Sequence, residues 1–148
     1  MKLFLDTNIL LDFILERQSF YSEAAMIMTF AEEERIKVCA SAVSFITASY
    51  ICVERCKMPI TVFRQKFDFI RNIVEICSVT SDDILHSYNS NWKDFEDGVQ
   101  YSSAKRAGSD AIVTRNVQDF EENEIPILSL EETCIKLKTA SRSVGHLL

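Results

Sequence analysis

The chain alternates between short continuous apolar runs and longer stretches in which apolar residues recur every three or four positions. The short runs predict β-strands at residues 1–5, 37–40, 111–114 and 125–128, and one alternating segment predicts a further strand at 74–79. The longer stretches predict α-helices at residues 9–15, 22–35, 44–57, 61–70, 81–89, 94–107 and from 129 onward. Strands separated by helices favour a mainly parallel sheet with helices on both faces. The pattern therefore predicts an α/β fold, a three-layer α/β/α sandwich.

Serine and glycine residues mark two of the predicted helix ends. Ser22 is a predicted N-cap, and Gly108 is a predicted C-cap because glycine readily adopts the left-handed conformation that ends many helices. The chain has only 3 Gly and 2 Pro, so no segment resembles a linker. We expect residues 1–148 to form one domain, in which residues 141–148 lack periodicity and fray.

The overall composition is that of a soluble globular protein, with 47% apolar and 26% charged residues. No apolar stretch reaches the roughly 18 residues of a membrane-spanning helix, so we expect no membrane partner and a cytoplasmic location. The five cysteines show no metal-site spacing with each other or with the two histidines. They are predicted to be reduced and to pack as small apolar residues.

The net charge of −6 disfavours nucleic acid binding as a primary role. That argument weakens if the acids gather around divalent metal, because such a cluster increases the negative total while bound cations reverse the local sign. The distribution of the charges is therefore more informative than their sum.

Acidic and polar residues follow two of the predicted strands. Asp6 ends the first apolar run and is followed by Thr7 and Asn8, and the run 111–114 leads into the segment 115–119. Right-handed crossovers place the carboxyl ends of parallel strands at one edge of the sheet, where ligands bind. We therefore expect these two segments to face the same crevice.

A third acidic segment lies at the start of a predicted helix, at Asp94 and Asp97. Each acid also has a simpler explanation: Asp6 and Asp94 as helix N-caps, and Asp119 as a turn residue. For Asp94 both explanations remain open. Three acidic segments that meet at one edge would repel one another unless a cation lay among them. Oxygen ligands of this kind suit Mg²⁺ or Mn²⁺, which support phosphodiester hydrolysis.

Three sequence motifs carry a resemblance to a known family. They are FLDTNILLD at residues 4–12, DFEDGVQ at 94–100 and IVTRNVQDF at 112–120. In order and spacing they resemble the PIN domain ribonucleases, which include the VapC toxins, over about residues 1–135. The resemblance implies a parallel-sheet sandwich whose acids hold Mg²⁺ or Mn²⁺ and cut RNA, in a protein that is a toxin with an antitoxin partner.

The resemblance also implies roles for individual residues. The acids assigned to catalysis and to the metal are Asp6, Asp97 and Asp119. Relatives place the last acid either where Asn116 stands or where Asp119 stands, and we assign it to Asp119 with Asn116 in support. Asn8 and Thr114 match polar residues that orient the acids or the metal's water.

One position departs from the family pattern. Relatives usually have a glutamate in the helix after the second strand, and the alignment places Thr47 there. Glu54 lies two helical turns further on and is a poor substitute. Asp94 is a candidate to compensate as a metal ligand. Without compensation, the site would hold metal less tightly or be inactive, so a catalytically impaired RNA-binding or partner-binding module is the alternative function.

Further expectations concern the partners. Arg115 adjoins the predicted site and is expected to bind an RNA phosphate, since guanidinium groups hold phosphate through two hydrogen bonds. Basic residues between 55 and 71 form either an RNA track or, more simply, a solvated helical face. The early helices are apolar around much of their girth, and relatives commonly dimerise there, so we expect a homodimer. A phosphatase that uses Asp6 is disfavoured because Asn8 stands where a second aspartate is usual.

Overall fold

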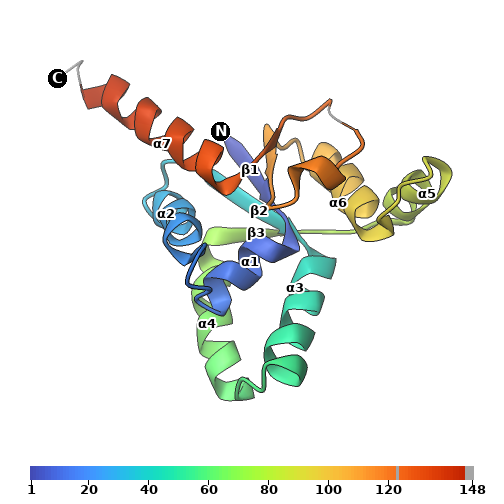
Figure 1. Ribbon diagram of the computed structural model, residues 1–148, viewed down its shortest axis with the longest axis horizontal. Coiled ribbons are helices and arrows are strands. Elements are labelled where there is room, and N and C mark those ends of the chain that lie inside the picture. Colours follow the sequence, from blue (N-terminus) through green and yellow to red (C-terminus); the bar gives the residue numbers. More distant parts are fainter. Residues whose placement is uncertain (123, 146–148) are drawn as a thin grey trace.

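A five-stranded parallel sheet forms the centre of the structure, a computed structural model that describes residues 1–122 and 124–145. Its strands, in spatial order, are β3 (Val74–Cys77), β2 (Lys37–Ser41), β1 (Lys2–Leu5), β4 (Ala111–Val113) and β5 (Ile127–Leu128). All four neighbouring pairs are parallel. The central position of β1 places the residue that follows it in the middle of the carboxyl edge (Figure 1).

Helices cover both faces of this sheet. They are α1 (Thr7–Ile14), α2 (Tyr21–Glu32), α3 (Ala42–Ser49), α4 (Ile60–Ile73), α5 (Ser81–Asn89), α6 (Phe95–Arg106) and α7 (Leu130–Gly145). A π-helical segment, η1 (Tyr50–Arg55), continues α3, and a 3-10 turn, η2 (Val117–Asp119), follows β4. Figure 1 shows α1, α2 and α7 on one side of the sheet and α6 with α5 on the other, which confirms the predicted α/β/α sandwich.

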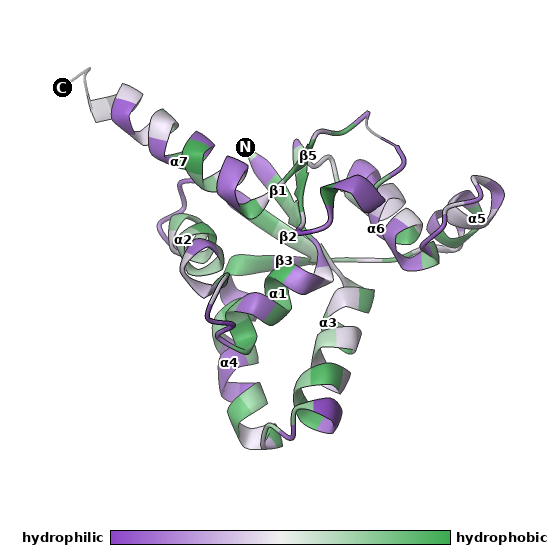
Figure 2. Ribbon diagram, viewed as in Figure 1, coloured by the Kyte–Doolittle hydropathy of each residue, from purple (hydrophilic) through white to green (hydrophobic). Residues whose placement is uncertain are grey.

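Two hydrophobic cores, one on each face, follow from the alternation of side chains along the strands. In β1, Leu3 and Leu5 pack into the core beneath α1, α2 and α7, whereas Phe4 packs on the opposite face with Tyr101 of α6. All three β1 residues are fully buried, and Figure 2 shows the central strands as mainly apolar. Because both faces are covered, β1 has the continuous apolar pattern seen in the sequence.

Three local predictions need correction. Ser22 is not an N-cap, because α2 begins at Tyr21 directly from a turn whose Arg17 carbonyl accepts the Phe20 and Tyr21 amides. The helix predicted at 44–57 changes to a π-helix at Tyr50. Residues 141–145, where the lack of periodicity predicted no helix, belong to α7, and the Ser141 hydroxyl donates to the Leu137 carbonyl; residues 146–148 lie outside the described residues. Gly108, with a φ of 69°, terminates α6 as predicted.

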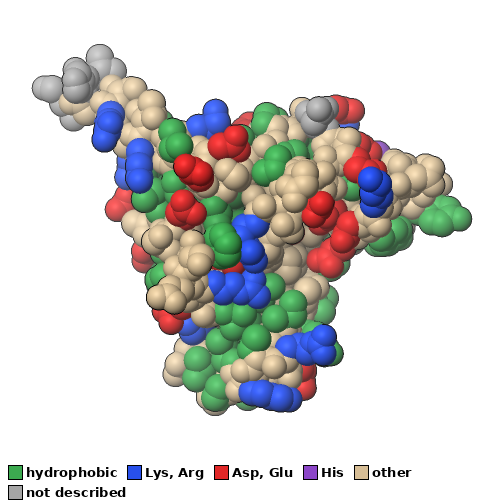
Figure 3. Space-filling view, in the orientation of Figure 1, with side chains coloured by type: hydrophobic (Ala, Val, Ile, Leu, Met, Phe, Trp, Pro, Cys, Tyr) green, Lys and Arg blue, Asp and Glu red, His purple; other side chains and the backbone are tan. Residues whose placement is uncertain are grey.

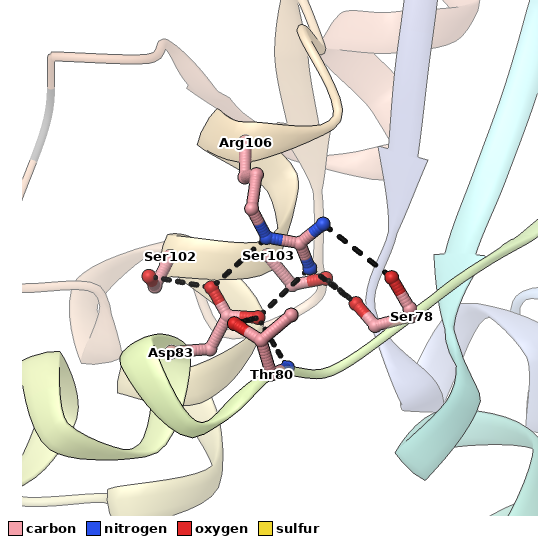
Figure 4. A network of polar contacts seen from close by, with 6 residues as sticks. All are labelled: Ser78, Thr80, Asp83, Ser102, Ser103 and Arg106. Atoms are coloured by element: carbon pink, nitrogen blue, oxygen red, sulfur yellow. Dashed lines mark hydrogen bonds and ion pairs between the residues drawn. The ribbon is translucent and has the colours of Figure 1, made fainter.

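An ion pair between the exposed Arg106 and the buried Asp83 holds α6 in place (Figure 4). Arg106 Nη2 lies 2.8 Å from Asp83 Oδ2 and also donates to the Ser78 carbonyl in the segment after β3. The Asp83 carboxylate further accepts hydrogen bonds from Ser102 Oγ and the Thr80 amide. Burial raises the pKa of Asp83, but the bonds from Arg106, Thr80 and Ser102 together hold it below its ordinary value. The C-terminal end of α6 is thereby attached to α5 and β3, which positions its N-terminal end at the sheet edge.

Gly98 lets α5 and α6 approach closely, one residue after Asp97. A Cβ atom at this position would lie 2.3 Å from Ser87 Oγ and 2.7 Å from the Trp92 ring. We expect Gly98→Ala to destabilise the protein by about 1–3 kcal/mol, because extra volume in a packed contact forces its neighbours apart. Gly145→Ala is the control, since a Cβ atom there would have no neighbour within 4 Å among the described residues. Equal unfolding free energies for the two variants in urea would contradict this account of the contact.

Within residues 1–122 and 124–145, no helix is long and apolar enough to cross a membrane. Four of the five free cysteines are buried as predicted, and Cys56 is exposed.

Candidate functional site at the carboxyl edge of the sheet

Asp6 is held at the centre of the site by hydrogen bonds from two segments, the start of α1 and the end of β4. It caps the N-terminus of α1, where its Oδ1 accepts a hydrogen bond from the Thr7 amide at 2.6 Å. Its Oδ2 accepts from Thr114 Oγ1 at 2.7 Å and from Asn8 Nδ2 at 3.1 Å. Asp6 is only 5% exposed, and this burial raises its pKa, although the bond from Thr114 opposes the rise. The predicted supporting residues Asn8 and Thr114 thus hold the Asp6 carboxylate in one orientation.

The N-terminus of α6 brings further acids to the same edge. Asp94 is the N-cap, and its Oδ1 accepts from the Asp97 amide at 3.1 Å. Burial, followed by the charges of Asp6, Asp94, Asp119 and Glu96, raises the pKa of Asp97 to about 7. The negative charges of two distant segments, at Asp6 and Asp119, therefore act on Asp97 together with those of its own helix start, as acids that share a crevice would.

The loop after β4 forms the opposite wall of the crevice. Asp119 lies in η2, and it lines a cavity of about 310 Å³ together with Asp94 of the α6 N-terminus. The other residues around this cavity are Lys93, Gln118 and Glu121. Figure 3 shows acidic side chains gathered on the face where α6 begins. Asp94 and Asp119, one acid from each of the last two motifs, thus line one opening, whereas Asp6 and Asp97 do not line it.

Helix α3 contributes a serine, Ser44, to the site. The Ser44 hydroxyl contacts Thr7 Oγ1 at 2.8 Å and donates to Gln100 Oε1 at 3.3 Å. Thr47 lies one turn further along α3, is half-buried, and makes no side-chain hydrogen bond within the part of the chain that the structure describes. Residues 42–49 include no acid, so α3 itself supplies no carboxylate to the site.

Glu96, Gln100 and Ser44 are site residues that the sequence motifs did not single out. Glu96 is half-buried and its Oε1 lies 3.1 Å from the Thr7 hydroxyl, which links it to Ser44 of α3. Burial raises the pKa of Glu96, and the Asp6 and Asp94 charges raise it further. Helical spacing in the sequence could have indicated two of them, because Glu96 and Gln100 are four residues apart and so share a face of α6.

Arg115 forms an ion pair with Asp12 of α1 and not with Asp6, Asp97 or Asp119. Its Nε lies 2.9 Å from Asp12 Oδ2, and its guanidinium lies 4.3 Å from the centre of the Phe20 ring. Asp12 is fully buried and has Arg17 as a second partner at 3.4 Å. Burial raises the pKa of Asp12 by more than the two guanidinium groups lower it. The Arg115 amide also donates to Asn8 Oδ1, so this residue helps to hold the loop against α1.

Asn116, the alternative position for the last acid, is exposed in the same loop. Its amide donates to Thr114 Oγ1 at 3.1 Å, the same hydroxyl that donates to Asp6. It therefore supports the site through its backbone.

The donor chemistry of the site fits a hard divalent cation bound through few protein ligands. Among the described residues, no three Asp, Glu, His or Cys side chains lie close enough to hold a metal ion as a ready-made shell. Mg²⁺ is commonly held by one or two carboxylates and keeps several waters, so it does not require such a shell. The carboxylates of Asp6, Asp97, Asp94, Glu96 and Asp119 are electrostatically coupled, and a cation would relieve their repulsion.

Comparisons with solved structures agree with the fold. The chain is similar to VapBC2 from Rickettsia felis bound to a DNA fragment from their promoter, with 16% identity, a TM-score of 0.66, and coverage of 87% of this chain and 98% of that chain. It is similar to a toxin–antitoxin complex from Klebsiella pneumoniae, with 18% identity, a TM-score of 0.62, and coverage of 86% and 96%. It is also similar to FitAB bound to an IR36 DNA fragment, with 13% identity, a TM-score of 0.60, and coverage of 86% of this chain and 94% of that chain.

At these identities the structural likeness shows the fold alone, and a comparison with curated proteins gives no match. The family is shown by a sequence model described as PIN domain, which matches residues 2–118. That range includes Asp6, which follows β1, the acids that begin α6 and the loop after β4 as far as Gln118, all of which the structure brings to one edge. The predicted resemblance is therefore confirmed, and this protein belongs to the PIN domain family.

Proposed function

We propose that this protein is a metal-dependent endoribonuclease that hydrolyses RNA phosphodiester bonds at the carboxyl edge of its sheet. The main support is the coupling of Asp97 to acids from three segments around the buried Asp6, in a chain that belongs to the PIN family. PIN domains are generally nucleases, and the proposal assigns that activity to this arrangement of side chains.

We assign the metal to Asp6, Asp97 and Asp119, of which one or two would bind it directly and the rest through its waters, with Asp94 at the rim of the cavity. Bound Mg²⁺ or Mn²⁺ would supply an activated water and would stabilise the leaving oxygen. Glu96 joins these acids, because its contact with Thr7 places a carboxylate beside α3, the helix that has no acid of its own. In this proposal Glu96 of α6 partly replaces the glutamate that α3 lacks at position 47, where Thr47 stands.

The chain's own groups have distinct tasks in this proposal. Thr114 and Asn8 keep Asp6 in a single orientation, which lowers the cost of organising the site before the reaction. Asp97, whose pKa is about 7 in the metal-free protein, loses its proton near neutral pH, and the deprotonated carboxylate is the form that would hold the metal. Arg115 remains our predicted phosphate ligand, through its outer nitrogens, because its Nε faces Asp12.

Partners are proposed from the similar structures and from the exposed surface. Two of these structures are described as bound to DNA and one as a toxin–antitoxin complex, which supports an antitoxin partner for this chain. For the homodimer, α1 gives less support than expected, since Ile9, Leu10 and Ile14 are buried. Exposed apolar side chains lie instead at Ile46 and Tyr50, on α3 and η1.

The pH dependence of metal binding tests the proposal. Without metal, the folded protein retains a proton on Asp97 that the unfolded chain has already lost, so this group's contribution to stability falls as the pH rises through about 7. A divalent metal binds the deprotonated form, so the increase in melting temperature on adding Mg²⁺ or Mn²⁺ should be larger at about pH 8 than at about pH 5.5. RNA cleavage should rise over the same range.

Asp97→Asn is the control, and its metal-induced increase in melting temperature should be small and independent of pH. The alternative is a module that binds RNA or a protein without cutting, for which the acid-free α3 is the specific support. That alternative predicts RNA binding without metal, intact RNA after incubation, and no metal-induced change in melting temperature for the wild type.

A further inference from the structure

The acidic crevice presents a problem for an RNA-cleaving enzyme, because its carboxylates repel the phosphate backbone. Neutralised phosphates contribute most of the affinity of proteins for nucleic acids. Cations near the opening are therefore needed to hold the strand while the acids act. The proposed function assigns only Arg115 to this task, and the inference below depends on that proposed function.

Most cations near the carboxyl edge already have acidic partners. Arg115 and Arg17 both face the buried carboxylate of Asp12, at 2.9 and 3.4 Å. At the other end of α6, away from this edge, Arg106 is paired with Asp83 and Lys105 with Glu124. These pairs reduce the net positive charge that each side chain presents to a phosphate.

Lys93 differs from these residues in both position and pairing. It lines the cavity of about 310 Å³ that Asp94 and Asp119 also line, and it is exposed. Its amide donates to Glu121 Oε1 at 3.4 Å, but its ammonium group makes no ion pair with any residue in the described ranges. It also directly precedes Asp94, the N-cap of α6, so its backbone is fixed at the rim while its long side chain can reach into the opening.

We infer that Lys93 is a substrate-binding residue whose ammonium group binds a phosphate of the RNA strand beside the bond that is cut. The contact is an electrostatic one to the backbone. It therefore adds affinity for RNA of any sequence and does not select a base.

The experiment compares Lys93→Gln with Lys105→Gln, a matched loss of one positive charge on a paired lysine at the other end of α6. Binding of a short single-stranded RNA is measured by fluorescence anisotropy at several salt concentrations. Asp6→Asn is the common background, so that the RNA stays intact. For Lys93→Gln the affinity should fall several-fold, and the slope of log affinity against log salt should decrease in magnitude by about 0.7. Lys93→Arg should restore both, and Lys105→Gln should change neither.

Cleavage by the otherwise wild-type protein provides the second measurement. Lys93→Gln should lower kcat/KM, with the larger part of the change in KM. If the wild type cleaves RNA and Lys93→Gln matches Lys105→Gln in slope and KM, the inference about Lys93 is wrong while the proposed function stands. If the wild type neither binds nor cleaves RNA with Mg²⁺ or Mn²⁺, both fail. Unaltered RNA binding with loss of a protein partner would also overturn the inference.

Discussion

Asp6→Asn is expected to lower metal-dependent RNA cleavage by more than about a hundredfold, since even outer partners of metal ligands typically contribute 10–100-fold. The substitution removes one negative charge and keeps the shape of the side chain. Asparagine can also cap α1, because its Oδ1 can still accept from the Thr7 amide. In the absence of metal, the melting temperature should stay the same or rise, because burial is the main cause of the raised pKa of Asp6.

The control for this variant is Asp110→Asn. Asp110 accepts a hydrogen bond from the Lys2 amide at 2.7 Å, where β1 begins and β4 has not yet started, so it lies at the opposite edge of the sheet. The Asp110→Asn variant should therefore retain both RNA cleavage and the metal-induced increase in melting temperature. If Asp6→Asn cleaves RNA at the wild-type rate, the acids at the carboxyl edge are not the catalytic site.

Arg115→Ala should lower the free energy of unfolding by about 3 kcal/mol, the second large effect that we expect. The substitution leaves the fully buried carboxylate of Asp12 with only Arg17, at 3.4 Å, and removes the contact with Phe20. The loss should become smaller as the pH is lowered, because protonation of Asp12 removes the uncompensated charge. Urea unfolding at two pH values measures both effects.

Two further variants separate this buried pair from ordinary surface charges. Arg71→Ala removes an exposed pair with Asp68, in which both side chains are more than half exposed, and should cost less than about 1 kcal/mol. Replacing both partners, as in Asp12→Leu with Arg115→Met, should recover most of the stability, because neither charge is then left buried alone. An Arg115→Ala variant as stable as Arg71→Ala would show that Asp12 does not depend on this partner.

The candidate site was predictable from the sequence where a residue's position along the chain fixes its place in the fold. Asp6 follows a buried strand, so it had to lie at the carboxyl edge of the sheet. Asp94 precedes α6 and caps it, as the N-cap explanation predicted. Thr114 follows β4 directly, and it reaches Asp6 because β4 pairs with β1. In each case the local pattern and the topology were sufficient.

Other parts of the site depend on contacts that no local pattern contains. Ser44 and Glu96 meet Thr7 across 37 and 89 residues of sequence, and Ser44 meets Gln100 across 56. Helical spacing shows which residues share a face, but it does not show which other helix that face meets. The partner of Arg115 could not be predicted for the same reason, since Asp12 is simply one more polar residue in an apolar helix.

The sequence by itself thus determined the α/β class, the edge at which the acids gather and the family to which the chain belongs. These depend on apolar periodicity and on three short motifs, which are properties of neighbouring residues. Only the tertiary structure decided that Ser44 and Glu96 enter the site, that Arg115 pairs with Asp12, and that Lys93 lies at the opening beside Asp94 and Asp119. These outcomes depend on how the helices pack on the sheet, where burial and charge are set by residues far apart in the chain.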